Sequence, residues 1–264
     1  MNRTGLLICL AIAAAVGIVF ALYPELDVTL SSYFYAGGHR WHVLDWPSGI
    51  VREAVSWIVT LVAAPAFIAL AVKWVLPRRP LLMPGRAIVL MISTLALGPG
   101  LMVNIILKDN WGRPRPQFLT EFGGPAPLLP WWDPRGKCDK NCSFVAGEPS
   151  GAFWTMAGAA VAPPHWRAAA YGAAIVFGSA VGVLRMSAGG HFFTDVVFSG
   201  VVVFLVIWLV HGLLYRWRAT RLTDADIERA LERLAMPGYD ALIRPSYDAV
   251  VRIAQRLRGT APRG

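Results

Sequence analysis

The stretch AIVLMISTLALGPGLMVNIILKDNWGRPRP, residues 87–116, decides the architecture of the chain. Its first 21 residues are uncharged and long enough to cross a hydrocarbon core of about 30 Å as a helix. The next nine residues contain Lys108, Arg113 and Arg115. Ionisable residues at membrane depth are costly and invite a functional explanation. A spanning helix that runs straight into a basic segment therefore predicts a membrane protein with a polar site at one face.

Five further apolar segments predict an all-α bundle of six transmembrane helices. The segment 151–164 is short at 14 residues, and we expect it to extend through His165 and Trp166 or to start below the membrane surface. The segment 5–23 follows Arg3 like a signal peptide, but no small-residue cleavage pattern comes after it, so a retained helix is favoured. The five segments are residues 5–23, 54–72, 151–164, 168–184 and 196–215.

The composition agrees with a membrane protein. The 264 residues are 56% hydrophobic and only 16% charged, whereas an ordinary soluble domain has nearer a quarter charged residues. This composition excludes a disordered chain and a disulfide scaffold. The net charge of +9 fits basic inner loops and an anionic substrate. Its charges lie in loops and the tail rather than on one soluble face, so nucleic acid is not the expected partner.

The basic loops orient the helices and place both termini in the cytoplasm by the positive-inside rule. The loop 108–150 then falls outside although it is basic, an exception that we accept because the other loops agree with the rule. Binding, rather than topology, is one reason for its charges. Cys138 and Cys142 lie in this loop, and in an oxidising compartment they could close a small disulfide. Its Trp131-Trp132 pair is typical of an interfacial anchor, with one wall of a headgroup pocket as the alternative.

The chain becomes polar after Tyr215. We therefore expect a membrane domain over 1–215 and a cytoplasmic, basic, amphipathic tail over 216–264. Thr223 and Asp226 form the pattern of a helix-capping box. The apolar positions of two amphipathic stretches follow at Ile227, Leu231, Leu234, and then Leu242, Val250, Ile253 and Leu257. The sequence leaves open whether the tail is solvated or lies on anionic lipid.

Three polar clusters lie at ends of predicted spans, and the expected topology puts all three at one membrane face. The clusters are residues 108–116, residues 148–151, and Arg185 with His191 and Asp195. Snorkelling explains a lone Lys73 but neither an imidazole nor the carboxylate that follows it. Several guanidinium and ammonium groups outside a lipid phase favour a multiply charged oxyanion, of which phosphate is the commonest.

The residue types also predict a chemistry. Ser150 and Gly151 at a helix start would offer backbone N–H groups and the positive dipole end to the same anion. His191 and Asp195, four residues apart, would share one helical face. Asp195 would then fix the imidazole tautomer and stabilise the cation formed when a ring nitrogen attacks phosphorus. No second His or carboxylate pair has the spacing of a metal site, so phosphoryl transfer without metal or cofactor is expected.

These motifs resemble the three-part signature of the type 2 phosphatidic acid phosphatase superfamily, which also includes vanadium haloperoxidases. The matches are, in order, Lys108 with Arg115-Pro116, then Pro149-Ser150-Gly151, then Arg185, His191 and Asp195. The signature spans about residues 108–195, and the resemblance covers about residues 50–215. The motif spacing selects Arg115 rather than Arg113. Two positions depart from the signature, since Ala152 stands in place of a His and Leu184 in place of a Ser.

The resemblance implies a lipid phosphatase in the bacterial inner membrane with a periplasmic active site. Its substrate would be a lipid phosphate or diphosphate, with lipid A or a polyprenyl diphosphate favoured, and its partner the bilayer. The implied roles are phosphate binding by Lys108, Arg115 and Arg185 with hydrogen bonds from Ser150 and Gly151, nucleophilic attack by His191 through a phosphohistidine, and orientation of His191 by Asp195. The oligomeric state is left open.

Ala152 is the most informative departure, because the family's His donates a proton to the departing oxygen. Its loss would cost about 10² to 10⁴ in rate. Three explanations remain open: the leaving group is intrinsically good, Glu148 donates the proton instead, or the protein is a catalytically silent lipid-phosphate binder or transporter. On the first explanation, Ala152→His would raise turnover on alkyl phosphates more than on diphosphates.

Overall fold

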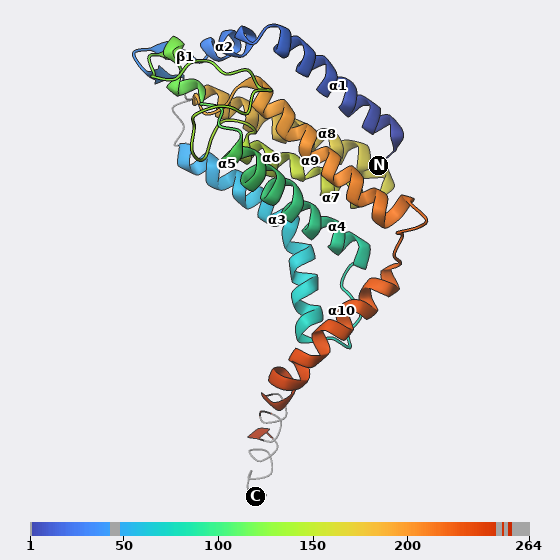
Figure 1. The fold of residues 1–264 in the computed structure, drawn as a ribbon. Coiled ribbons are helices and arrows are strands. Elements are labelled where there is room, and N and C mark those ends of the chain that lie inside the picture. The colour runs from blue at the N-terminus through green and yellow to red at the C-terminus, as the bar shows by residue number, and fades with distance from the viewer. Residues whose placement is uncertain (1, 43–47, 247–249, 251–252, 255–264) are drawn as a thin grey trace, which may run out of the picture.

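Figure 1 shows the computed structural model, which describes residues 2–42, 48–246, 250 and 253–254. The predicted all-α fold is confirmed. Within the described chain, the antiparallel pair β1 (Tyr35–Gly37) and β2 (Arg40–Trp41) forms the only sheet. Five helices are long and apolar enough to cross a membrane. These candidate spans are Arg3–Leu22, Glu53–Val75, Gly85–Asn110, Pro164–Ser187 and Phe193–Arg216.

Four of these spans are built on single α-helices, and the fifth is composite. The single helices are α1 (Arg3–Leu22), α3 (Ser48–Val75), α8 (Pro164–Ser187) and α9 (Phe193–His211), the last continued by the π-helical turn η4 (Gly212–Arg216). In the composite span, α4 (Gly85–Leu95) continues as the π-helical stretch η1 (Ala96–Leu107) and the single turn α5 (Lys108–Asn110). Pro99 lies inside η1 and has no N–H to donate. The Asn104 side chain donates to the Pro99 carbonyl at 2.7 Å, which satisfies that oxygen within the apolar span.

The expected fourth span is two short helices rather than one long helix. These are α6 (Gly147–Trp154) and α7 (Met156–Val161), separated at Thr155. His165 and Trp166 belong to α8, so the expected extension through them is wrong, and the helix instead begins earlier, at Gly147. Small residues let α6 and α7 pack closely against α8 and α9. Neither short helix has the length of a candidate span, so the count of six spans stays a prediction.

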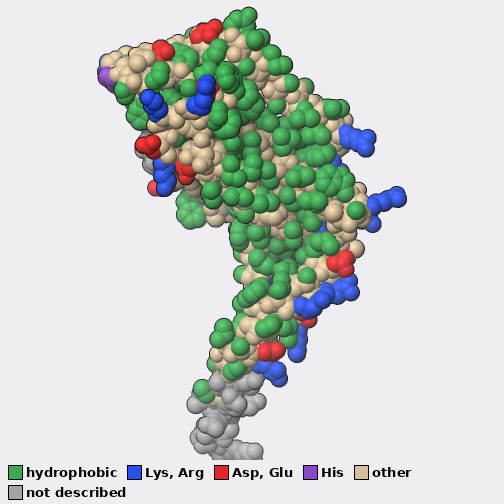
Figure 2. Space-filling model, viewed as in Figure 1, with side chains coloured by type: hydrophobic (Ala, Val, Ile, Leu, Met, Phe, Trp, Pro, Cys, Tyr) green, Lys and Arg blue, Asp and Glu red, His purple; other side chains and the backbone are tan. Residues whose placement is uncertain are grey.

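α9 lies at the centre of the bundle. α1, α4 and α6 pack against it, and α1 runs along its outer side in Figure 1. Trp154 of α6 is fully buried and donates its indole N–H to Thr94 Oγ1 at 3.0 Å. Large apolar side chains such as Leu61 and Val176 are 69% exposed, as expected for a surface that faces lipid tails. Figure 2 shows hydrophobic side chains covering much of the bundle and Lys and Arg toward its ends.

The remaining short elements lie at the two ends. α2 (Glu25–Ser32), η2 (Pro116–Phe118) and η3 (Thr120–Phe122) lie in the segments at one end, and α10 (Asp224–Gly238) and η5 (Tyr239–Ile243) form the tail. The predicted capping box is confirmed, because Thr223 and Asp226 exchange hydrogen bonds at the start of α10. Val250 and Ile253 are exposed, and Leu257 lies outside the described residues.

The first helix of the tail docks on the membrane bundle. α10 packs against α3 and α4, and the Arg86 guanidinium lies 2.8 Å from the Asp224 carboxylate. Lys73 is only 3% exposed, and its Nζ lies 3.2 Å from Glu228 Oε1. The expectation that Lys73 snorkels to the interface is therefore wrong, since this lysine is buried in an ion pair with the tail.

Candidate active site

The three polar clusters meet at one end of the bundle, where η1, the start of α6 and the turn between α8 and α9 come together. Backbone hydrogen bonds hold the loop after α5 in place across this end. The Cys142 N–H donates to the Lys108 carbonyl at 3.1 Å, and the Ser143 N–H donates to the Arg113 carbonyl at 2.9 Å. The expected disulfide between Cys138 and Cys142 is present and closes the same loop.

Trp131 holds this loop against the helices. Its ring stacks on Phe198 of α9 with centroids 4.3 Å apart, and its indole N–H donates to the Gly17 carbonyl of α1 at 3.1 Å. These contacts give the ring a packing role beside the two expectations of an interfacial anchor or a pocket wall, which stay predictions. Trp132 is 48% exposed.

His191 lies in the turn before α9 and is 2% exposed. Because α9 begins at Phe193, His191 and Asp195 do not share a helical face as expected. The imidazole Nδ1 lies 2.7 Å from the Ser143 carbonyl oxygen and 3.8 Å from Asp195 Oδ2. A carbonyl oxygen can only accept, so we assign the proton to Nδ1, which leaves the lone pair on Nε2. Ser143, which no sequence motif selects, thus sets the tautomer.

Asp195 is fully buried and supports His191 through Ser143. Its carboxylate accepts hydrogen bonds from Arg113 Nη1 at 2.6 Å, from the Phe192 N–H at 2.8 Å, and from the Ser143 hydroxyl. The bond from Phe192 also caps the start of α9. Because Asp195 accepts the hydrogen bond of the Ser143 hydroxyl, it fixes the Ser143 carbonyl beside the imidazole.

Arg113 lies between two buried carboxylates. Its Nη2 is 2.8 Å from Asp27 Oδ2 of α2, and its Nη1 bonds Asp195. Asp27 also accepts from the Thr194 hydroxyl at 2.5 Å, and the Phe192 ring centroid lies 4.1 Å from the guanidinium carbon. Burial raises the pKa of Asp27, and the charge of Arg113 opposes that shift. The result is a closed, hydrogen-bonded charge network behind His191.

Three cations lie on the open side of the site. Arg185 Nε is buried and lies 3.5 Å from Glu148 Oε2, with no hydrogen-bond acceptor among the described residues. Lys108 is within electrostatic range of Arg115, Glu148 and Arg185. Arg115 is partly exposed and donates to the carbonyl and side-chain oxygens of Asn141 at 2.9 and 2.8 Å. Three cations gathered around one carboxylate favour binding of a further anion.

Two glycines allow the cations to approach. A Cβ at Gly147 would lie 3.1 Å from Lys108 Nζ, and one at Gly190 would lie 2.9 Å from Arg185 Nη2. A side chain at either position would displace a cation.

The start of α6 differs from the expected one, whereas the anion contacts expected of Ser150 and Gly151 stay a prediction. Ser150 is fully buried, its N–H donates to the Ala146 carbonyl at 3.2 Å, and its hydroxyl donates to the Gly147 carbonyl at 2.6 Å. Because α6 begins at Gly147, Ser150 and Gly151 lie inside the helix rather than at its start. The first N–H groups of the helix belong to Gly147 and Glu148, so the positive end of the helix dipole lies one turn earlier than expected.

Ala152 is fully buried, one turn after Glu148. A larger side chain at this position would have to displace packed neighbours. We therefore expect Ala152→His to destabilise α6 rather than to raise turnover on alkyl phosphates, which reverses the expectation from sequence. Glu148, by contrast, lies at the helix start beside Arg185.

The charges of the site also act on His191. Burial lowers the pKa of His191, Asp195 raises it, and Arg185 and Arg115 lower it further. The imidazole is therefore neutral at neutral pH, as a nucleophile requires. Within the described residues, no group of three or more His, Cys, Asp or Glu side chains is arranged to hold a metal ion.

The chain is similar in sequence to one protein family and to curated members of known activity. Residues 87–219 match the PAP2 superfamily. The lipid A 4′-phosphatase of Francisella tularensis subsp. novicida (strain U112) is 36% identical over 227 residues, which cover 82% of this chain and 98% of that protein. The lipid A 4′-phosphatase of Rhizobium leguminosarum is 37% identical over 119 residues, which cover 44% of this chain and 51% of that protein. No solved structure gives a significant match.

Proposed function

The chain belongs to the PAP2 superfamily, and we propose that it removes the 4′-phosphate of lipid A through a phosphohistidine on His191. It is a multi-pass bacterial membrane lipid phosphatase. The match to nearly the full length of a lipid A 4′-phosphatase supports the substrate. The observation that carries the mechanism is a buried imidazole held through Nδ1 by Ser143, in electrostatic range of two cations. We place the chain in the inner membrane with the site at the periplasmic face, since the basic loops lie at the opposite end.

Lys108, Arg115 and Arg185 bind the non-bridging oxygens of the substrate phosphate in this proposal. The Arg185 Nε–H supports it, because this buried donor lacks a hydrogen-bond acceptor among the described residues and a phosphate oxygen would satisfy it. The N–H groups at the start of α6 add the positive end of the helix dipole. These contacts neutralise charge on the transferring phosphoryl group.

The lone pair of His191 Nε2 then attacks phosphorus, and the bond from phosphorus to the sugar oxygen breaks. The new imidazolium charge is stabilised by the Ser143 carbonyl at Nδ1 and by the negative charge of Asp195 behind it. Water next attacks phosphorus, the phosphorus–nitrogen bond breaks, and His191 returns to its neutral form with release of inorganic phosphate.

Three explanations were left open for Ala152. The chemistry of the leaving group favours the one in which Glu148 donates the proton. Carbon 4′ of the sugar is not anomeric, so the 4′-oxygen leaves as a poorly stabilised alkoxide unless it is protonated. Glu148 lies 3.5 Å from Arg185, where the phosphate would bind. Glu148 would then protonate the sugar oxygen and later take a proton from the attacking water.

The test uses the purified full chain in detergent with lipid A that carries a labelled phosphate at position 4′ only or at position 1 only. We expect release from position 4′ and, after rapid quenching, an acid-labile, alkali-stable phosphoprotein. His191→Ala should abolish both signals, whereas His165→Ala, at an exposed position at the far end of α8, should retain them. Release by His191→Ala at the wild-type rate would rule out the nucleophile, and release only from position 1 would rule out the substrate position.

A further inference from the structure

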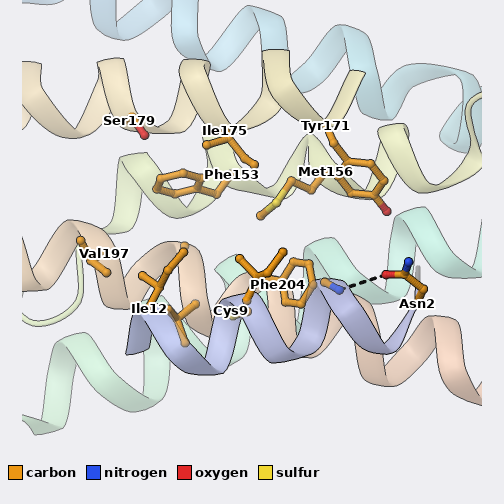
Figure 3. Close-up of a pocket in the computed structure, with 14 residues that line it drawn as sticks. Asn2, Cys9, Ile12, Phe153, Met156, Tyr171, Ile175, Ser179, Val197 and Phe204 are labelled. Carbon is orange, nitrogen blue, oxygen red and sulfur yellow. Dashed lines mark hydrogen bonds between the residues drawn. The ribbon is translucent and has the colours of Figure 1, made fainter. Parts of the chain in front are cut away.

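An apolar groove between α1, α8 and α9 takes no part in the chemistry above. Its volume is about 430 Å³, within the range of small-molecule binding pockets. Figure 3 shows its lining, which is almost entirely apolar. The residues used below are Asn2, Ile12, Tyr171, Ile175, Ser179 and Phe204. A groove of this composition in a membrane protein fits a hydrocarbon chain.

One end of the groove is polar. Figure 3 places Asn2 and Tyr171 together at this end, while Ile12 and Ser179 lie toward the other. The Tyr171 hydroxyl oxygen is buried and has no hydrogen-bond partner within the described chain. A buried hydroxyl without a partner is costly, so this end fits a ligand with a polar group.

Cations surround the polar end. The Arg216 guanidinium lies 3.9 Å from the Trp208 ring centroid, and the Trp208 indole N–H donates to the Asn2 carbonyl at 3.3 Å. Arg167 is within electrostatic range of Tyr171, and Arg3 is within range of Arg216. None of these three arginines forms a salt bridge with a carboxylate of the described chain. The arginines are Arg3, Arg167 and Arg216.

We propose that the groove binds one acyl chain of an anionic phospholipid whose headgroup lies among Arg3, Arg167 and Arg216. Arg167 and Arg185 lie near opposite ends of α8. They are 18 positions apart, a rise of about 27 Å, which is close to the thickness of a hydrocarbon core. The ligand is therefore a lipid of the leaflet opposite the active site rather than the substrate. This inference rests on the membrane-spanning fold and is independent of the proposed substrate and mechanism.

Native mass spectrometry of the full chain tests the site with phosphatidylglycerol and phosphatidylcholine that carry identical acyl chains. We expect wild-type protein to bind phosphatidylglycerol more tightly. A cation near an anionic lipid contributes about 1 kcal/mol, or about fivefold in affinity, so Arg3→Gln/Arg167→Gln should weaken phosphatidylglycerol binding roughly 25-fold. The exposed pair Arg218→Gln/Arg221→Gln removes the same charge outside the groove and should have little effect.

A second pair of variants tests the groove itself. Ile175→Trp fills the groove and should weaken binding of both lipids, whereas Val176→Trp, at the adjacent exposed position outside the lining, should weaken neither. Equal affinity of wild-type protein for the two lipids, or equal losses in the two arginine pairs, would overturn the proposal. The same holds if Ile175→Trp leaves phosphatidylglycerol binding intact and raises KM for lipid A, because the groove would then hold a substrate chain.

Discussion

Arg113 and Arg115 lie two residues apart in the same loop, but their side chains are in opposite surroundings. Arg113 is 1% exposed and lies between Asp27 and Asp195. Arg115 is partly exposed at the edge of the site and donates hydrogen bonds to the backbone and side-chain oxygens of Asn141. The first arginine is enclosed by two carboxylates, whereas the second lies at the open edge of the site.

This contrast separates two uses of one residue type. A buried guanidinium needs carboxylates to offset its desolvation, and once they are in place it binds nothing further. A guanidinium at an open edge remains hydrated and can exchange water for phosphate oxygens. The site therefore combines a closed network that fixes Ser143 and Asp195 with an open group of cations that, in the proposed function, binds the substrate phosphate.

Of the substitutions that test this contrast, Arg113→Ala should have the largest effect on stability and activity. It leaves the carboxylates of Asp27 and Asp195 buried without their cation, so the free energy of unfolding should fall by about 3–5 kcal/mol and activity should be lost with it. Denaturant unfolding in mixed micelles measures the change. Arg244→Ala breaks a pair with Asp240 that is exposed on both sides and should leave stability unchanged. Wild-type stability in Arg113→Ala would show that the closed network is dispensable.

Glu148→Gln keeps the shape of the open side but removes the proposed proton donor. We expect kcat on the 4′-phosphate of lipid A to fall by about 10² to 10⁴, with little change on an aryl phosphate whose leaving group needs no proton. Steady-state phosphate release on both substrates measures this. Asp139→Asn removes an exposed carboxylate of the same loop and serves as control. Equal losses on the two substrates would count against a proton-donor role.

Arg115→Gln tests the other half of the contrast. Loss of one phosphate contact should lower kcat/KM about 10²-fold, while the free energy of unfolding stays close to that of wild type. Activity and denaturant unfolding are measured on the same preparation. A loss of stability as large as that of Arg113→Ala would mean that the two arginines have the same structural role.

The smallest expected effect is a shift in the pH profile of kcat/KM when Arg115 is replaced by Gln. His191 attacks as the neutral imidazole, so kcat/KM should fall as the pH drops through its pKa, which burial and the nearby cations hold below the ordinary value. Removing the charge of Arg115 lets this pKa rise, so the acidic limb of Arg115→Gln should move to higher pH. Arg221→Gln, at the far end of the chain's membrane bundle, should not move it. A shift to lower pH would contradict the electrostatic role of Arg115.

The helices were predictable where the signal is local. Five uncharged runs correspond to the five candidate spans, because hydrophobic length alone decides whether a helix can cross a bilayer. The fourth predicted span differs, since α6 and α7 are short and their burial depends on the helices around them. Because α6 begins at Gly147, the positive end of its dipole lies about one turn before Ser150, a difference that no composition window detects.

The candidate site was predictable only in part, for the same reason. Lys108, Arg185 and His191 stand in a spaced motif, so the sequence identified them as a group. Asp27 and Ser143 stand in no motif that the sequence revealed. Asp27 meets Arg113 and Thr194 across long stretches of chain, and Ser143 meets His191 through its backbone oxygen. Contacts made through main-chain atoms carry no side-chain signature.

The sequence by itself determined that this chain is an all-α membrane protein with cations and an imidazole at the ends of its helices, because hydrophobic length and motif spacing are properties of neighbouring residues. Only the tertiary structure decided which arginine is closed off by carboxylates, which carbonyl sets the tautomer of His191, and where α6 begins. Those outcomes depend on which groups become buried together. A buried polar group must find its hydrogen-bond partner wherever the fold places one, however distant in the chain.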